Sequence, residues 1–384
     1  MPENRRLLVA TGIFHPESGG PATYLYELLP HLQARGWQVQ VITYGDTAQP
    51  SAHYPYPVQR IPRRTLPLRL TDYARATYAA LGTADVVYIH TLGLPLLPRG
   101  HAPRILKIVG DQAWERAIRK GWIPPTEDID HFQTQRYSPI VTLQQAVRAR
   151  EARGMDAIIV PSQYLKRMVT GWGVDPARIH VIYNALPPAE SAAPLTQAAA
   201  RVQLGLDDRP LLLTAARLYP WKGVDSLIQA LSDVPDVRLL VAGDGPESSR
   251  LRERAAALNL TGRVTFLGNV PREKLAVYMH AADYFALYSG YEGLSHALLE
   301  SLRAGTPVIA SDKGGNPEVV THDVNGLLVP YVDIPALSAA LVTAFAPGKR
   351  AQLAAQTALG LERFNFQTML DQTAAVLEAS LLYG

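Results

Sequence analysis

The chain contains no cysteine among its 384 residues. A disulfide framework and a thiolate metal site are therefore both excluded. Long apolar runs are lacking too, because no stretch approaches the roughly 18 apolar residues of a membrane-spanning helix. The early apolar run Leu7–Ala10 is too short for the core of a signal peptide. These absences lead us to expect a cytoplasmic protein, with peripheral contact at the inner membrane face left open.

The chain also has little excess charge of one sign. It carries 37 Lys and Arg residues against 34 Asp and Glu residues, a formal net charge of +3. This is too small to indicate a protein that binds nucleic acid. One segment, Arg60–Arg69, mixes cations with apolar residues, a composition that can rest on an anionic membrane surface. A solvated loop is the simpler interpretation, because the segment is short and holds two prolines.

The pattern of apolar residues predicts an α/β fold. Hydrophobic residues make up 47% of the chain and charged residues 18%, which is typical of globular domains. Short apolar runs alternate with segments of helical spacing, and this predicts parallel sheets with helices on both faces. The strands expected in the first half are Arg6–Thr11, Gln38–Tyr44, Val86–His90, Ile105–Val109 and Ala157–Val160. Those expected in the second half are Leu211–Ala216, Val237–Ala242, Val264–Leu267, Tyr284–Leu287 and Val308–Ala310.

A segment rich in Pro, Ala and Ser, residues 184–194, separates the two series and is interpreted as a linker. We therefore expect two doubly wound, Rossmann-like domains, over residues 1–187 and 188–365. The terminal helix, 366–384, is expected to pack back on the first domain. Ligands on such sheets bind beyond the carboxyl ends of the strands, so we expect the site in a cleft between the domains.

The most informative stretch follows the predicted strand Tyr284–Leu287. Ser295 is suited to cap a helix that begins at His296. The free N–H groups of that helix start, which includes Ala297, form a binding site for an anion such as a diphosphate. Apolar residues on either side of the cap, Leu294 and Leu299, are placed as a hydrophobic staple.

Two carboxylates flank this helix start. Glu292 lies in the loop ahead of the helix and Glu300 lies one turn inside it. At that separation they can accept hydrogen bonds from two different hydroxyl-bearing parts of one ligand. A nucleotide sugar offers both parts, the sugar ring and the ribose diol.

Two cations follow the predicted strand Leu211–Ala216. Arg217 and Lys222 both lie at its carboxyl end. A departing nucleoside diphosphate accumulates negative charge, which fixed cations stabilise in the transition state. An ordinary pair of surface cations is the alternative interpretation of these two residues taken alone.

Glycine pairs recur at the same edge of both predicted sheets. Glycine allows the backbone to approach a phosphate or a sugar closely. Each pair alone is only a turn, but all of them follow predicted strands. The residues concerned are Gly19 with Gly20, Gly243 with Gly245, and Gly314 with Gly315.

A D-x-D sequence, Asp128–Asp130, is the one pattern that could suggest a divalent cation. It lies in a polar stretch away from any predicted strand end, so we interpret it as a solvated loop or the start of a helix. His15, His90 and His131 have no orienting partner in the sequence, and structural roles are expected for them.

With these residues in view, the second half of the chain resembles the group 1 glycosyltransferases, the retaining family 4 with the two-domain GT-B fold. The residues that carry the resemblance are Arg217 with Lys222, Gly243–Pro246, Glu292 and Glu300 in an E-x7-E arrangement, Ala304–Ala310, and Gly314–Gly315 with Glu318. The first half matches more loosely through Gly19–Gly20, Asp156–Ser162 and Val181–Asn184.

The resemblance implies transfer of a hexosyl unit from a UDP- or GDP-sugar to a hydroxyl of a glycan, a lipid-linked or a small-molecule acceptor, with retention. It implies that Arg217 and Lys222 bind the donor diphosphate, Glu300 the ribose and Glu292 the transferred sugar, with Val270 near the base. The leaving phosphate would help to deprotonate the acceptor, and neither a metal nor a cofactor would be required.

The chain departs from the family at one catalytic position. Many relatives carry a His where this chain has Gly110–Asp111, and Asp111 is expected to take its place. A nucleotide-sugar epimerase on the same fold and a non-catalytic protein that binds sugar nucleotides stay open as alternatives. The presence of the charged site residues argues against the second alternative: Glu292, Glu300, Arg217 and Lys222.

Overall fold

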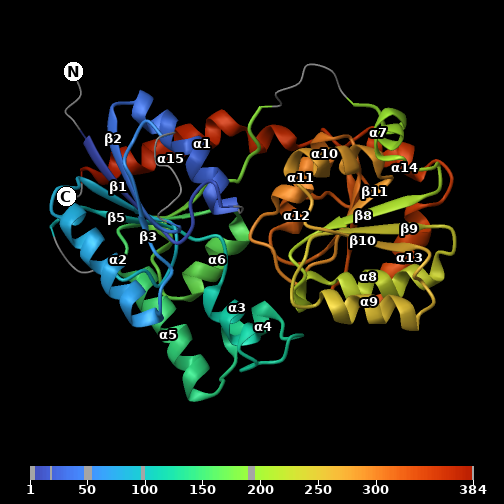
Figure 1. Ribbon diagram of the computed structural model, residues 1–384, viewed down its shortest axis with the longest axis horizontal. Helices are drawn as coiled ribbons and strands as arrows, with labels where there is room; N and C mark the ends of the chain where they lie inside the picture. The colour runs from blue at the N-terminus through green and yellow to red at the C-terminus, as the bar shows by residue number, and fades with distance from the viewer. Residues whose placement is uncertain (1–4, 18–19, 47–53, 97–99, 189–194, 383–384) are drawn as a thin grey trace. The chain divides into compact units, whose positions relative to one another are not determined.

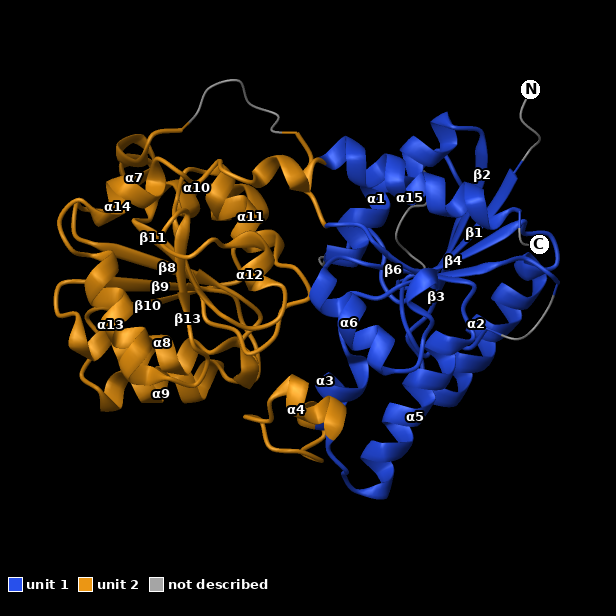
Figure 2. Cartoon of the chain, turned by 180° about the vertical axis from the view of Figure 1, so that it is seen from behind, with its two compact units in different colours: residues 1–117, 135–183, 366–384 blue, residues 118–134, 184–365 orange. Residues whose placement is uncertain are grey.

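The computed structural model describes residues 5–17, 20–46, 54–96, 100–188 and 195–382 (Figure 1). The chain divides by its internal contacts into two compact units (Figure 2). Unit 1 comprises residues 1–117, 135–183 and 366–384, and unit 2 comprises residues 118–134 and 184–365. Each unit is built on one parallel sheet covered by helices, which is the fold class expected from the sequence.

Unit 1 holds a seven-stranded sheet with the order β3-β2-β1-β4-β5-β6-β7. Its strands are β1 Arg5–Thr11, β2 Trp37–Tyr44, β3 Val58–Ile61, β4 Val86–Ile89, β5 Arg104–Lys107, β6 Ala157–Val160 and β7 Ile179–Val181. Its helices are α1 Gly20–Ala34, α2 Leu66–Leu81, α3 Gln112–Arg119, α5 Pro139–Arg153, α6 Gln163–Gly171 and α15 Phe366–Ser380, with the short η1 Pro176–Arg178. Helix α3 ends just inside the segment assigned to unit 2.

The terminal helix α15 packs within unit 1, against α1, β4 and β6. The hydroxyl oxygens of Tyr24 on α1 and Thr373 on α15 lie 2.9 Å apart. Asp371 on the same helix forms an ion pair with Arg35. These contacts explain why residues 366–384 group with the first unit although they end the chain.

Unit 2 holds a six-stranded sheet with the order β10-β9-β8-β11-β12-β13. Its strands are β8 Leu211–Ala215, β9 Arg238–Ala242, β10 Val264–Gly268, β11 Tyr284–Leu287, β12 Val308–Ser311 and β13 Gly326–Val329. Its helices are α4 Ile129–Thr134, α7 Gln197–Leu204, α8 Val224–Ala230, α9 Ser248–Ala257, α10 Arg272–Ala281, α11 His296–Arg303, α12 Asn316–Val319, α13 Ile334–Ala344 and α14 Lys349–Ala354. Short turns η2 Pro220–Lys222, η3 Leu231–Asp233 and η4 Leu361–Phe364 complete it.

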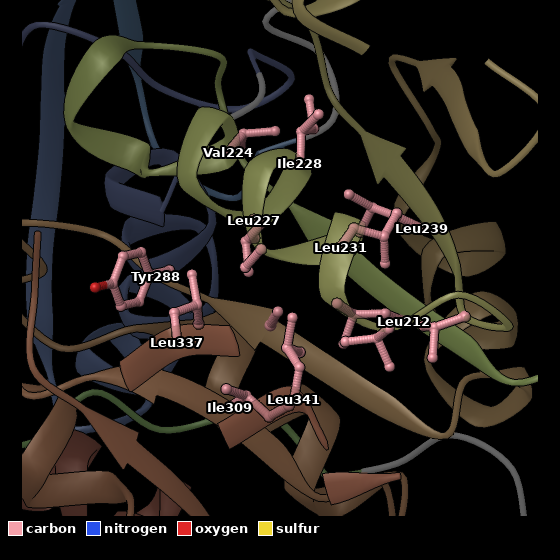
Figure 3. Packing of buried hydrophobic residues seen from close by; sticks show 14 of the residues in the cluster. Leu212, Val224, Leu227, Ile228, Leu231, Leu239, Tyr288, Ile309, Leu337 and Leu341 are labelled. Carbon is pink, nitrogen blue, oxygen red and sulfur yellow. The ribbon is translucent and has the colours of Figure 1, made fainter. Parts of the chain in front are cut away.

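The core of unit 2 lies between the sheet and the helices α8 and α13 (Figure 3). Leu227 of α8 and Leu341 of α13 are both fully buried in it. Tyr288, which directly follows β11, belongs to the same cluster, and its hydroxyl accepts a hydrogen bond from the backbone N–H of Asp333. The loop that starts at Tyr288 is therefore anchored in the core before it reaches the candidate site.

The boundary between the units lies at residues 183 and 184, four residues before the expected one at 187. Asn184 donates a hydrogen bond from Nδ2 to the carbonyl of Leu294, and Arg303 donates one to the carbonyl of Pro187. Both bonds join residues 184–187 to the rest of unit 2. The assignment of residues 118–134 to unit 2 was not expected from the sequence.

The segment Arg60–Arg69 is not a single solvated loop, so that expectation is wrong. Strand β3 includes Arg60, whose side chain is buried and donates to the carbonyl of His15 at 2.6 Å. Helix α2 already begins at Leu66, which leaves only residues 62–65 as a loop. Within the described ranges, no helix is both long and apolar enough to cross a membrane.

Candidate active site

The candidate site is built where the strand order of unit 2 reverses. Strands β8 and β11 are parallel neighbours at the centre of the sheet, and the chain proceeds outward from β8 toward β10 and from β11 toward β13. Loops that follow the two central strands diverge at such a point, which leaves room for a ligand. Arg217 and Lys222 follow β8, and Glu292 follows β11.

Lys222 and Glu292 form a direct ion pair in the described structure. Nζ of Lys222 lies 2.6 Å from Oε1 of Glu292, and both side chains are more than four-fifths buried. The two loops are also joined by their backbones, because the N–H of Gly290 donates to the carbonyl of Trp221 at 2.7 Å. A cation and a carboxylate from two separate strand ends are thereby held at one place.

Gly223 allows the close approach of these two loops. Its φ is +66°, a left-handed conformation that favours glycine. A Cβ atom at this position would lie 1.9 Å from the carbonyl oxygen of Tyr288. Any larger residue would therefore separate the Lys222 turn from the loop that carries Glu292.

Helix α11 begins at His296, as the sequence predicts. The Ser295 hydroxyl accepts a hydrogen bond from the N–H of Leu298 at 3.4 Å, so Ser295 is the N-cap. Leu294 and Leu299 are buried on either side of the cap. His296 and Ala297, in the first turn, are partly exposed, so a ligand can reach the start of α11. This helix start directly follows the loop that carries Glu292.

Glu300 has a partner that the sequence analysis missed. Oε1 of Glu300 accepts hydrogen bonds from Nε and Nη2 of Arg272, at 3.2 and 3.1 Å. Arg272 opens α10, two residues after Val270 in the loop that follows β10. The sequence did hold a signal for this partner: Arg272 is a third cation just beyond a strand end, because β10 ends at Gly268.

The remaining glycines of unit 2 join neighbouring loops. The N–H of Gly243, after β9, donates to the carbonyl of Gly268, the last residue of β10, at 2.7 Å. Gly245 packs against the backbone of Leu218, which leaves no space for a side chain. Gly315 donates its N–H to the carbonyl of Glu292 at 2.8 Å. These glycines lie at the edge of the sheet that carries the charged residues.

Arg217 directly precedes a buried residue, Leu218, but is itself exposed. Its guanidinium lies 5.7 Å from the centre of the Tyr219 ring. The Tyr219 ring is stacked on Trp221 at 4.7 Å. The aromatic pair supports the turn that carries both cations, and the long Arg217 side chain extends from it into solvent.

The expected site residues of unit 1 have other surroundings. Gly20 is the first residue of α1, and Gly19 lies outside the described residues. Asp111 is fully buried and forms an ion pair with Arg148. Its Oδ1 accepts a hydrogen bond from the N–H of Ala113 at 3.0 Å, which caps α3. A catalytic role for Asp111 stays a prediction, and its described contacts are structural.

Asp128 begins a helix, which was one of the two interpretations of the D-x-D sequence. Its Oδ1 accepts hydrogen bonds from the N–H groups of Asp130 and His131, and α4 follows directly. Its Oδ2 lies 2.8 Å from Nζ of Lys313, a partner that the sequence analysis missed. In the parts of the chain that the structure describes, no group of three or more His, Cys, Asp or Glu residues is arranged to hold a metal ion.

Comparison with known families covers both halves of the chain. Residues 18–190 match the model of glycosyltransferase family 4, and residues 196–358 match that of the glycosyl transferases group 1. The chain is a glycosyltransferase with the GT-B fold, and its two halves belong to these two matching families. The second match spans the loops that carry Lys222 and Glu292, and helix α11 with Glu300.

Relatives of this glycosyltransferase cover most of its length. A D-inositol 3-phosphate glycosyltransferase of Mycobacterium sp. (strain JLS) is 29% identical over 83% of this chain and 76% of its own length. A GDP-mannose-dependent monoacylated alpha-(1-6)-phosphatidylinositol monomannoside mannosyltransferase of Corynebacterium glutamicum is 29% identical over 89% of each chain. The solved sucrose-phosphate synthase of Thermosynechococcus elongatus shares the fold, with a TM-score of 0.81 at 24% identity over 99% of this chain and 100% of that chain.

Proposed function

We propose that this glycosyltransferase moves a hexosyl unit, with retention, from a UDP- or GDP-sugar to a hydroxyl of a glycan, a lipid-linked or a small-molecule acceptor, without a metal ion or a cofactor. The observation that carries the proposal is the 2.6 Å ion pair between Lys222 and Glu292 at the point where the strand order reverses. It brings a cation for a diphosphate and an acceptor for sugar hydroxyls to the open start of α11.

In the proposed mechanism Lys222 and Arg217 stabilise the charge that develops on the leaving nucleoside diphosphate. The N–H groups at the start of α11 add a further positive electrostatic contribution there. A carboxylate has two oxygens, so Glu292 can keep its bond to Lys222 through one and accept a sugar hydroxyl through the other. The same pair therefore orients the sugar and its leaving group.

The nucleoside end of the donor is assigned to Glu300. Arg272 holds one oxygen of this carboxylate, so the other is oriented to accept from the ribose diol. Val270 lies in the loop just before Arg272 and is assigned to the base. This places the contacts to ribose and to base on two adjacent segments, α11 and the β10–α10 loop.

The proposed chemistry retains the configuration at the anomeric carbon. The bond between the sugar C1 and the diphosphate oxygen breaks, and the acceptor oxygen bonds to C1 on the same face. The proton of the acceptor hydroxyl passes to the departing phosphate. The cations beside the phosphate stabilise the charge that remains on the leaving group.

Peripheral membrane contact is part of the proposal, because one relative is by name a mannosyltransferase of a monoacylated phosphatidylinositol mannoside. Helix α2 begins with Leu66 and Leu68, whose exposed fractions are 58% and 53%. Arg63 and Arg64 precede them and are also exposed. Exposed apolar residues beside cations suit the surface of an anionic membrane. Sedimentation with anionic and with neutral vesicles tests this contact.

The proposed reaction is tested by incubating the protein with UDP-glucose, UDP-GlcNAc and GDP-mannose in the presence of EDTA. Released nucleotide identifies the donor, and NMR of the glycoside formed with an added acceptor gives its anomeric configuration. We expect one donor to turn over with retention and with EDTA present. An inverted product would contradict the mechanism, and conversion of the sugar without any acceptor would indicate an epimerase.

A further inference from the structure

Residues 118–134 meet the rest of unit 2 through an ion pair next to the candidate site. Oδ2 of Asp128 lies 2.8 Å from Nζ of Lys313, and Oδ2 of Asp130 lies 3.9 Å from the same nitrogen. Lys313 follows β12 and directly precedes Gly314 and Gly315. The segment shares the colour of unit 2 in Figure 2.

The Asp128 carboxylate is fixed before it meets Lys313. Its other oxygen accepts from the N–H groups of Asp130 and His131, at 2.8 and 3.1 Å. Burial alone would raise the pKa of Asp128, but the hydrogen bond from Lys313 and those from the backbone lower it from its ordinary value. Asp128 is therefore a charged and oriented partner, which reduces the entropy lost when the pair forms.

The turn that starts at Lys313 supports the backbone of Glu292. The N–H of Gly315 donates to the Glu292 carbonyl at 2.8 Å. Gly314 lies so close that a Cβ atom there would be 2.3 Å from the same carbonyl oxygen. A shift of this turn would therefore move Glu292 together with its bond to Lys222.

We propose that Lys313 is a positioning residue for the transfer reaction, and that its ion pair with Asp128 holds the Lys313–Gly315 turn in the place that orients Glu292. This inference rests on the proposed function, because it gives Glu292 the sugar as its ligand. It also assigns a role to the Asp128–Asp130 sequence without a metal. Through Asp128, the 118–134 segment holds the Lys313 turn of unit 2 in position.

The pair is expected to matter more for turnover than for folding. Ion pairs that solvent reaches contribute little to stability, and the exposed fractions here are 28% for Lys313 and 33% for Asp128. A small displacement of a group that orients the reacting sugar has a larger effect on rate. The effect of the pair should therefore appear in kcat at saturating donor.

The test uses Lys313→Met and Asp128→Asn in the full-length protein, because Asn can still cap α4. We expect kcat to fall about threefold to tenfold in each variant, with the donor KM changed by less than about twofold. The double variant should be no worse than either single variant, since both remove the same pair. Lys313→Arg should restore kcat.

Lys349→Met is the matched control, because Lys349 pairs with Asp323 in the same unit. We expect it to leave kcat unchanged, and we expect all variants to unfold at the wild-type midpoint. Unchanged kcat in Lys313→Met and Asp128→Asn would overturn the inference, as would additive losses in the double variant. Absence of turnover in the wild type with every donor would overturn the proposed function itself.

Discussion

Tyr24 on α1 and Lys107 at the end of β5 meet in the interior of unit 1, where Nζ of Lys107 lies 3.8 Å from the centre of the Tyr24 ring. Lys107 is only 3% exposed, and within the described residues its ammonium has no hydrogen-bond partner. His90, from the adjacent strand end, packs on the same ring at 5.1 Å. Burial lowers the pKa of Lys107 to about 7 from 10.5, and it lowers that of His90 well below its ordinary value.

This arrangement predicts how stability depends on pH. The depressed pKa means that the unfolded chain binds more protons than the folded chain between pH 7 and 10.5. The free energy of unfolding should therefore rise with pH across that window. Below pH 7 Lys107 should cause no such rise, because the amine is protonated in both states. Lys107→Met removes the buried amine, so we expect it to abolish this part of the slope and to stabilise the protein at pH 7 by a few kcal/mol.

Urea unfolding at several pH values measures this effect. Lys120→Met is the control, because Lys120 is an exposed lysine whose loss should leave the slope as it is in the wild type. A Lys107→Met variant that is less stable than the wild type at pH 7 would show that the amine has a favourable partner in solution.

Glu300→Ala should weaken nucleoside recognition. Loss of a charged hydrogen-bond acceptor for the ribose predicts about tenfold weaker binding of the matching nucleoside diphosphate. Arg272→Ala should have the smaller effect of about threefold, because it only frees Glu300 to move. Isothermal titration measures both, with Glu253→Ala on the exposed face of α9 as the control. Equal affinity in the wild type and Glu300→Ala would exclude a ribose contact at Glu300.

Ser295→Ala should cost about 1 kcal/mol of stability through loss of the α11 cap. Thr196→Ala is a matched control, since Thr196 caps α7 in the same way: its Oγ1 accepts a hydrogen bond from the N–H of Ala199 at 3.2 Å. Both variants should lose similar stability in thermal unfolding, but only Ser295→Ala should also weaken diphosphate binding. Equal binding in both variants would mean that the start of α11 does not contact the donor.

Gly314→Ala should be far more damaging than Gly348→Ala. Both glycines have positive φ, +62° and +79°, so each alanine costs about 1–2 kcal/mol for its conformation. A Cβ at Gly348 meets no atom within 4 Å, whereas one at Gly314 collides with the carbonyl of Glu292. We expect a total of about 3 kcal/mol or more for Gly314→Ala, with loss of turnover. Similar stabilities for the two variants would contradict the described packing.

The sequence predicts the fold well wherever strands are central and apolar. Each of the strands expected in both halves is present, but three further strands were not expected: β3, β7 and β13. All three lie at sheet edges, where strands are short and less apolar. Strand β3 has the sequence Val-Gln-Arg-Ile and β7 has only three residues, so neither has the apolar pattern of a central strand.

The candidate site divides in the same way between local and distant relationships. The cap at Ser295 and the charged residues at strand ends depend on a few neighbouring residues, so spacing reveals them. The pairs Arg272–Glu300 and Asp128–Lys313 join segments that are distant in the chain. Charge alone gives no periodic pattern, and their partners become visible only once the loops are placed in space.

The most direct test of the donor site is isothermal titration of UDP, GDP and their sugars into the wild type and into Lys222→Ala, with turnover of both proteins measured at saturating donor. We predict saturable binding of one nucleotide class by the wild type, and a variant that binds the diphosphate more weakly and turns over about a hundredfold more slowly at saturating donor. No saturable binding by the wild type, or unchanged binding and turnover in Lys222→Ala, would contradict the account.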